Sequence, residues 1–175
     1  MLYDLLKMLV SICFNLLNKL LGGGLPPFGS VAVIVEQDNR YLMVELPRKR
    51  LVFPGGFMQW QEKPAQTAKR EGKEETGLDL HVAQLINIYS RTSTNILKMS
   101  TICFVYRAEV MGGTLRKNIE GVPMWVTEDE IRTRLDAYTL GILEDYLRFR
   151  QSHWDTTTSQ WTGAPSTVSA GFISL

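Results

Sequence analysis

Acidic side chains cluster in the segment from Gly56 to Leu78. We expect a helix over residues 64–76. On such a helix Glu71, Glu74 and Glu75 stand at positions i, i+3 and i+4, so their carboxylates converge on one face. Like charges at this spacing repel each other unless a cation neutralises them. The segment contains no Cys or His, and ligands that are all oxygen suit Mg²⁺ or Mn²⁺. The pattern therefore predicts a divalent metal site.

The same segment resembles the Nudix box, G-x5-E-x7-R-E-U-x-E-E-x-G-U, in which U is an aliphatic residue. Gly72 departs from this pattern, because the first U normally carries a bulky side chain that anchors the helix to the sheet. With Ala65 and Ala68 it leaves a small inner face, so we expect the helix to lie unusually close to the strands beneath it. A solvated acidic helix without a metal is the competing interpretation. The matching positions are Gly56, Glu62, Arg70, Glu71, Glu74, Glu75, Gly77 and Leu78.

Nudix enzymes typically split a diphosphate linked to another moiety. The resemblance therefore implies a pyrophosphohydrolase that uses Mg²⁺ or Mn²⁺, built as an α/β/α sandwich with a mixed β-sheet. Glu74 and Glu75 are the first metal ligands expected, and Glu71 is either a third ligand or the base that takes a proton from water. Gly56 would offer its backbone carbonyl to the metal. Arg70 is a permanent cation, so we expect it to brace the carboxylates in one geometry.

Two further acids extend the candidate site. Glu62, near the start of the helix, would ligate weakly or pair with Arg70. Glu120 lies between two predicted strands, where related enzymes often place an additional metal-binding or base-providing glutamate; an ordinary solvated acid is the alternative. We assign catalysis to Glu71, Glu74 and Arg70, and metal binding to Gly56, Glu71, Glu74, Glu75 and Glu120.

No contiguous motif identifies the residues that would bind a nucleotide-type substrate. Tyr89, Tyr106 and Trp125, with Phe104, would offer a stacking surface to a base, although aromatic residues in strands are more often part of the core. Arg48 and Arg50 would meet a phosphate, with a solvated basic loop as the alternative. The sequence lacks the downstream marks of the ADP-ribose, diadenosine-polyphosphate and NADH branches of the family. Nucleoside triphosphates, ADP-ribose-like diphosphates and nucleotide sugars all stay open.

A non-catalytic nucleotide-sensing module with the same fold is the main alternative function. Such modules tend to lose the acids of the box, and all of them are present here, so the enzyme is favoured. An interaction protein that acts through its N-terminal helix is a third possibility, which the intact site chemistry disfavours.

Length and composition indicate one domain with extensions at both ends. The chain has 175 residues, of which 45% are hydrophobic, and we place the domain at residues 30–150. Within it we expect a hairpin of two strands at 31–35 and 41–46, and a final helix at 131–148. The other expected strands are 51–53, 80–89, 98–110 and 123–126.

Charge and cysteine content narrow the partners and the compartment. A formal net charge of +1 gives no electrostatic footprint for extended nucleic acid. Only Cys13 and Cys103 occur, too few for a disulfide framework, so a reducing, cytoplasmic compartment is favoured.

The first 29 residues predict an amphipathic helix followed by a Gly/Pro linker. Residues 1–21 are mostly apolar, but a narrow polar stripe runs down one helical face. This stripe argues against a membrane-spanning helix, and no cleavage site supports a signal peptide. We expect the helix to make a peripheral membrane contact, or else to pack on a homodimer partner or on its own domain. Residues 151–175 are rich in Ser and Thr, and we expect a disordered tail. The stripe consists of Asp4, Lys7, Ser11, Asn15 and Asn18.

Overall fold

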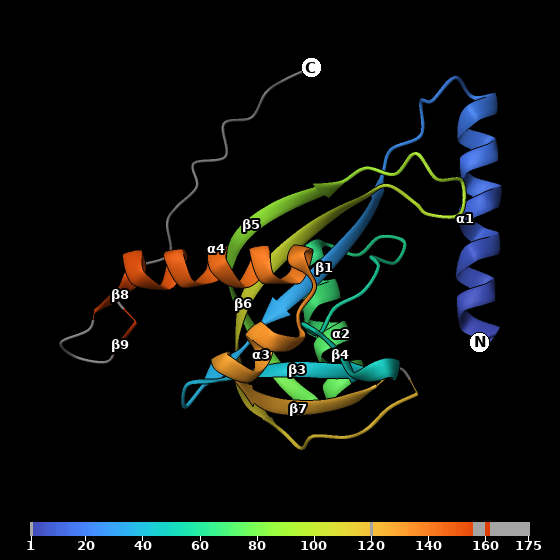
Figure 1. Ribbon diagram of the computed structural model, residues 1–175. Helices are drawn as coiled ribbons and strands as arrows, with labels where there is room; N and C mark the ends of the chain where they lie inside the picture. Colours follow the sequence, from blue (N-terminus) through green and yellow to red (C-terminus); the bar gives the residue numbers. More distant parts are fainter. Residues whose placement is uncertain (1, 120, 156–159, 162–175) are drawn as a thin grey trace.

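The computed structural model describes residues 2–119, 121–155 and 160–161 (Figure 1). The elements in chain order are α1 (Leu2–Leu20), β1 (Phe28–Ile34), β2 (Glu36–Gln37), β3 (Arg40–Leu46), the 3₁₀ turn η1 (Pro47–Lys49), β4 (Arg50–Val52), α2 (Pro64–Thr76), β5 (Leu78–Arg91), β6 (Thr101–Gly113), β7 (Val122–Thr127), α3 (Glu128–Arg134), α4 (Ala137–His153), β8 (Trp154–Asp155) and β9 (Gln160–Trp161).

The strands form two main sheets between helices. In the first sheet β6 lies parallel to β1 and antiparallel to β5, so this sheet is mixed. In the second sheet β3 pairs with β2, β4 and β7. Alternate residues of β1 enter two different cores: Val33 packs with Ala68 of α2, and Ile34 packs with Leu143 of α4. The helices α2 and α4 therefore cover opposite faces, which confirms the expected α/β/α sandwich with a mixed sheet (Figure 1).

Helix α2 has the expected bounds, and local signals set both of its ends. Pro64 occupies the first turn, and the Lys63 N–H donates to the Gln66 side chain at 2.9 Å. At the other end Gly77 adopts a left-handed conformation with φ of 80°. A Cβ atom placed on Gly72 would lie 2.4 Å from Cδ1 of Leu80 in β5. The helix therefore lies close to the sheet at Ala68 and Gly72, as predicted, but Ala65 is exposed and does not belong to the inner face.

The expected hairpin of strands 31–35 and 41–46 is wrong. Strand β1 pairs with β6, and β3 belongs to the other sheet. The turn at Asp38 and Asn39, with φ of 51° and 57°, joins β2 to β3 instead. The loop after β4 covers the second edge of β1. The N–H groups of Val31 and Val33 donate to carbonyl oxygens of this loop. The turn residues show where the chain reverses but not which strands pair.

The expected final helix over 131–148 is also wrong, because two helices occupy this region. Leu135 has an extended backbone with φ of −80° and ψ of 145°, which ends α3. The Asp136 side chain then accepts a hydrogen bond from the Thr139 N–H at 2.8 Å and so caps the start of α4. Asp136 is a capping residue of a common type, and it marks the start of α4 in the sequence.

The two chain extensions are only partly described. Helix α4 continues to His153, and β8 pairs with β9 in antiparallel fashion, so the described part of 151–175 carries regular structure. The remainder of that segment lies outside the described residues. At the other end α1 stands at the outer edge of the molecule (Figure 1). Within the described residues, every helix is too short or too polar to cross a bilayer.

Candidate active site

The loop after β4 lies along the edge of β1 and is hydrogen-bonded to it. The N–H of Val31 donates to the Gly56 carbonyl at 2.9 Å, and the N–H of Val33 donates to the Pro54 carbonyl at 2.8 Å. A Cβ atom on Gly55 would lie 2.1 Å from the Val31 carbonyl oxygen. Only a residue without a side chain fits at that position, which explains the first glycine of the pair.

The second glycine of the pair makes room for a carboxylate of α2. A Cβ atom on Gly56 would lie 2.4 Å from Oε1 and 2.7 Å from Oε2 of Glu71. Gly56 and Glu71, both predicted to bind metal, are therefore direct neighbours. The Gly56 carbonyl oxygen already accepts the Val31 N–H, which leaves it one further lone pair.

Arg70 connects three carboxylates. Its Nε and Nη2 atoms bind the two oxygens of Glu62 at 2.7 and 2.9 Å, a two-pronged pairing that fits the guanidinium plane. Its Nη1 atom donates to Glu71 at 2.8 Å and to Glu74 at 3.0 Å. Nη2 also donates to the Phe57 carbonyl at 3.1 Å, which ties the helix to the preceding loop.

The electrostatics of this cluster follow from the arginine. Hydrogen bonds from Arg70, and then one from the Gln59 N–H, lower the pKa of Glu62 to about 2. Thr67 adds a hydrogen bond from its hydroxyl to the same carboxylate at 2.9 Å. The carboxylates in turn raise the pKa of Arg70, with Glu62 as the main cause. Glu62 is therefore a permanently ionised partner of Arg70 at neutral pH.

Glu75 is buried against the loop that carries Gly55 and Gly56. Its side chain is buried, with 6% exposure, and its Oε2 atom accepts a hydrogen bond from the Gly55 N–H at 2.8 Å. Glu71 and Glu74 share Arg70, and Glu75 binds the N–H of Gly55, the residue before the Gly56 that Glu71 lies against. That the three carboxylates converge on one metal stays a prediction. In the part of the chain that the structure describes, no group of three acidic, His or Cys side chains is placed to hold a metal ion. Glu120 lies outside the described residues.

The donor set nevertheless fits Mg²⁺ or Mn²⁺ in its chemistry. Every candidate ligand supplies oxygen, which these hard cations prefer. The space beside Gly56 admits a carboxylate and would be closed by any side chain. Nη1 of Arg70 contacts Oε1 of Glu71 and Oε2 of Glu74, one oxygen of each carboxylate, so the guanidinium orients both groups.

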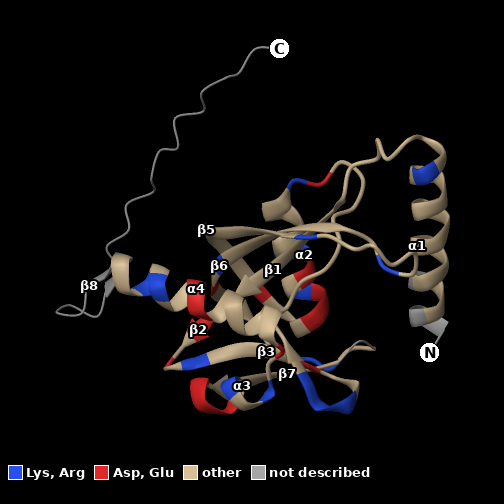
Figure 2. Ribbon diagram, turned by 45° about the horizontal axis from the view of Figure 1, so that its top comes forward, with Lys and Arg blue, Asp and Glu red and all other residues tan. Residues whose placement is uncertain are grey.

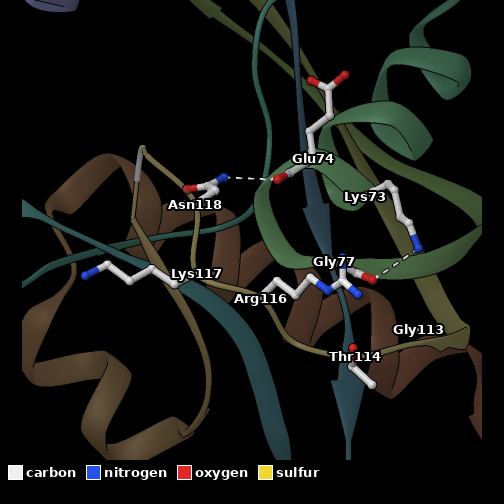
Figure 3. Close-up of a pocket in the computed structure, with 8 residues that line it drawn as sticks. All are labelled: Lys73, Glu74, Gly77, Gly113, Thr114, Arg116, Lys117 and Asn118. Atoms are coloured by element: carbon white, nitrogen blue, oxygen red, sulfur yellow. Dashed lines mark hydrogen bonds between the residues drawn. The ribbon is translucent and has the colours of Figure 1, made fainter.

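A pocket of about 390 Å³ opens beside Glu74, at the carboxyl end of α2 (Figure 3). The Asn118 side chain donates to the Glu74 carbonyl at 3.0 Å, and the Arg116 N–H donates to the Thr76 carbonyl at 2.9 Å. These bonds satisfy carbonyl groups that the end of the helix leaves free. In Figure 3 the Glu74 carboxylate points away from Arg116. The hydrogen bonds from Asn118 and Arg116 hold the loop before β7 against the end of α2.

The two predicted basic substrate contacts lie in and just after a strained turn. Arg48 and Arg50 are exposed, and Arg48 and Lys49 have φ of 66° and 59°. Such values are uncommon for residues other than glycine. Nη2 of Arg134 donates to the Lys49 carbonyl at 2.8 Å and so supports the turn.

The predicted aromatic contacts do not share one surface. Tyr89 packs against the core beneath α4, whereas Tyr106 and Trp125 pack against the core beneath α2. A single stacking platform made of all three is therefore absent from this arrangement of described residues. A role in substrate binding stays a separate prediction for each of them.

Sequence reasoning missed a group of residues at the start of α4. The Tyr138 ring lies 5.9 Å from the Tyr89 ring, and Cζ of Arg91 lies 5.1 Å from the centre of the Tyr138 ring. Burial opposes ionisation of Asp136, but hydrogen bonds from Thr139 and the charges of Arg50 and Arg91 lower its pKa. The break between α3 and α4 assembles this group, which an unbroken helix over 131–148 would not predict.

Comparison with known proteins places this arrangement in a family. The profile of the NUDIX domain matches residues 26–146. A MutT-like protein of Streptomyces ambofaciens is 30% identical over 125 residues, which are 68% of this chain and 78% of that protein. An ADP-ribose pyrophosphatase of Methanocaldococcus jannaschii is 30% identical over 132 residues, covering 72% of this chain and 76% of that protein. A NUDIX hydrolase structure from Nitrosomonas europaea superposes with a TM-score of 0.65 at 26% identity, over 79% of this chain and all of that one.

The chain therefore belongs to the NUDIX domain family. This confirms the expected class of enzyme, a Nudix pyrophosphohydrolase.

Proposed function

We propose that this enzyme hydrolyses the pyrophosphate bond of a nucleoside diphosphate linked to another moiety. A nucleoside triphosphate, ADP-ribose or a nucleotide sugar would be the substrate, and Mg²⁺ or Mn²⁺ the cofactor. The observation that carries the proposal is the Arg70 cluster, in which one guanidinium holds Glu62, Glu71 and Glu74 beside the Gly56 loop. The ADP-ribose pyrophosphatase of Methanocaldococcus jannaschii supports the substrate class.

In this proposal Gly56, Glu71, Glu74 and Glu75 hold the metal, with Glu120 as a further ligand. A divalent ion supplies charge neutralisation and lowers the pKa of water at a pyrophosphate. Arg70 keeps Glu71 and Glu74 oriented. The burial of Glu75 and its bond to the Gly55 N–H fix a third carboxylate against the loop.

Proton transfer falls to a carboxylate. Glu71 is 13% exposed in its side chain and lies against Gly56, so it would act on a water held beside that loop. Glu74 is 57% exposed and is the second choice for the base.

The substrate would be held by cations and aromatic rings around the cluster. Arg48 and Arg50 would bind phosphate, a role supported by the exposure of Arg48 in the turn η1 and of Arg50 at the start of β4. Tyr89 would bind the base together with Tyr138. The rings of these two residues meet edge to face. Tyr106 and Trp125 would serve a separate contact on the α2 side of the sheet.

A substrate panel tests the activity. The purified chain would be incubated with ADP-ribose, nucleotide sugars, and nucleoside di- and triphosphates, each with Mg²⁺, with Mn²⁺ and with a chelator. We expect nucleotide or phosphate release with at least one of these compounds and only with metal. Silence across the panel with both metals would contradict the proposal, and nucleotide binding without turnover would indicate a sensing module.

We also propose that α1 gives the enzyme a second contact, either with the surface of a membrane or with another copy of the chain. The exposed leucines of this helix support an apolar partner.

A further inference from the structure

The N-terminal helix α1 packs its polar face against its own protein and exposes its apolar face. This is the reverse of an ordinary surface helix. Such a helix buries its apolar face and exposes its polar one. In α1, Ser11 is buried with 4% exposure, and Asn15 and Asn18 are half-buried. Nδ2 of Asn15 donates to two carbonyl oxygens of the β5–β6 loop at 2.8 and 3.1 Å, and Oδ1 of Asn18 accepts from the Leu25 N–H at 2.9 Å. The polar stripe therefore fastens the helix to its own protein.

The fastening is reinforced at the helix end. The rings of Phe14 and Phe28 meet edge to face with centroids 4.4 Å apart. The N–H of Gly23 donates to the Asn18 carbonyl at 2.8 Å, and Gly22 and Gly23 have positive φ, which closes the last turn. The rotation of α1 about its own axis is thus set by specific contacts.

The outward face is a continuous apolar surface. At 3.6 residues per turn its exposed apolar positions span an arc of roughly 140°, centred opposite the polar stripe. Leu9 is 49% exposed and Leu20 is 83% exposed. Among the described side chains of α1, Lys19 is the one exposed residue with a charge. The large apolar residues of this outward face are Leu5, Leu6, Leu9, Val10, Leu16, Leu17 and Leu20.

The surroundings of this face carry positive charge. The sequence of α1 contains Lys7, Lys19 and one acid, Asp4, and the adjoining β5–β6 loop (residues 92–100) contains Lys98 and no acid. Lys98 lies beside the helix, because its carbonyl oxygen accepts from Asn15, and its side chain is exposed. In Figure 2 the part of α1 that is coloured by charge shows blue and no red, and Asp4 in the first turn is the one acid in the sequence of the helix.

We propose that the outward face of α1 binds the surface of an anionic lipid bilayer, with the helix lying in the plane of the interface. The inference names the partner of the second contact proposed above and is independent of the hydrolase activity. An apolar face with neighbouring cations matches acyl chains below anionic headgroups. A second copy of α1 would cover only a narrow seam of so wide an arc.

Sedimentation with lipid vesicles tests the proposal on the full chain, without metal or substrate, so that its failure is separable from failure of the activity. Vesicles of phosphatidylcholine with phosphatidylserine should bind the protein, and vesicles of phosphatidylcholine alone should bind it more weakly. The double variant Leu9→Glu/Leu16→Glu should weaken binding by roughly tenfold or more. The matched control Leu85→Glu/Met111→Glu changes two exposed apolar residues of the sheet by the same charge and should bind as the unaltered chain does.

Cys13 provides a direct probe of insertion. It is exposed near the middle of the apolar arc, and Cys103 is buried, so a thiol-reactive fluorophore will label Cys13. Its emission should shift to the blue on adding anionic vesicles, and lipids with a quencher on the acyl chain should quench it. Equal binding by the double variant would overturn the proposal. A second result would also overturn it: light scattering without vesicles finds that the chain is a dimer, and Leu9→Glu/Leu16→Glu converts this dimer to a monomer.

Discussion

The carboxylate of Glu71 occupies the space that a side chain on Gly56 would need, since a Cβ atom there would lie 2.4 Å from Oε1. Gly56→Ala should therefore displace the carboxylate proposed as ligand or base while leaving most of the fold intact. A misplacement of this size lowers turnover by roughly 100-fold. Steady-state kinetics on the substrate found in the panel measure the effect. Gly141→Ala is the control, because a Cβ on Gly141 of α4 meets nothing within 4 Å; equal rates in both variants would contradict the assignment.

Arg70 should not be replaceable by lysine. The guanidinium contacts Glu62 with two nitrogen atoms and reaches Glu71 and Glu74 with the third. An ammonium group keeps the charge but cannot make these bonds together. Arg70→Lys should therefore lower kcat by tenfold or more, on the order of one positioning interaction, with a smaller change in KM.

The matched control for that variant is Arg132→Lys. Arg132 also joins two carboxylates, Glu128 and Glu144, but on α3 and α4. Its replacement should leave kcat unchanged. An Arg70→Lys enzyme as active as the Arg132→Lys enzyme would show that the cluster is only structural.

The Glu62–Arg70 pair should make stability depend on acid pH. The ordinary pKa of Glu62 is 4.5 and its folded-state pKa is about 2. Because the folded-state pKa is lowered, the pair stabilises the fold fully above about pH 4.5, and this contribution is lost as the pH falls toward 2. Chemical denaturation followed by circular dichroism should find Glu62→Gln less stable at neutral pH, with the difference shrinking between pH 4.5 and 2. A difference that is constant with pH would contradict the pairing.

Gly72 should be coupled to Leu80. A Cβ on Gly72 would lie 2.4 Å from Cδ1 and 3.2 Å from Cγ of Leu80. Gly72→Ala gains about 1 kcal/mol of helix propensity but overpacks the interface at a cost of about 1 to 3 kcal/mol. We expect net destabilisation in thermal unfolding.

Shortening the partner should relieve that strain. In Gly72→Ala/Leu80→Val the loss of free energy of unfolding should be smaller than the sum of the two single losses. Simple additivity would show that the close approach of helix and strand is not what excludes a larger residue at position 72.

Features that depend on residues close together in the chain could be predicted from the sequence. The Nudix box is contiguous, and the start at Pro64 and the stop at Gly77 bound α2 as observed. The pairing of Glu62 with Arg70 was also anticipated, because eight residues place one near the start of the helix and the other along the same face.

What the sequence could not predict depends on contacts between distant segments. The apolar run of β1 reads as one arm of a hairpin, yet its partner β6 lies about seventy residues further along. Glu75 and Glu74 are neighbours on the helix, but Glu75 is buried against the Gly55 N–H, whereas the side chain of Glu74 is 57% exposed. The aromatic residues likewise read as one set, and the sheet separates Tyr89 from Tyr106 and Trp125.

The most direct test of the central claim is the metal-dependent hydrolysis rate of Glu75→Gln. The amide oxygen of glutamine can still accept the Gly55 N–H, so the fold should be retained while the negative charge is lost. Asp129→Asn removes one exposed charge from α3 and serves as the control. We predict a loss of roughly 100-fold or more for Glu75→Gln and no loss for Asp129→Asn. Full activity of a folded Glu75→Gln enzyme would contradict the assignment of α2 as the hydrolytic, metal-binding helix.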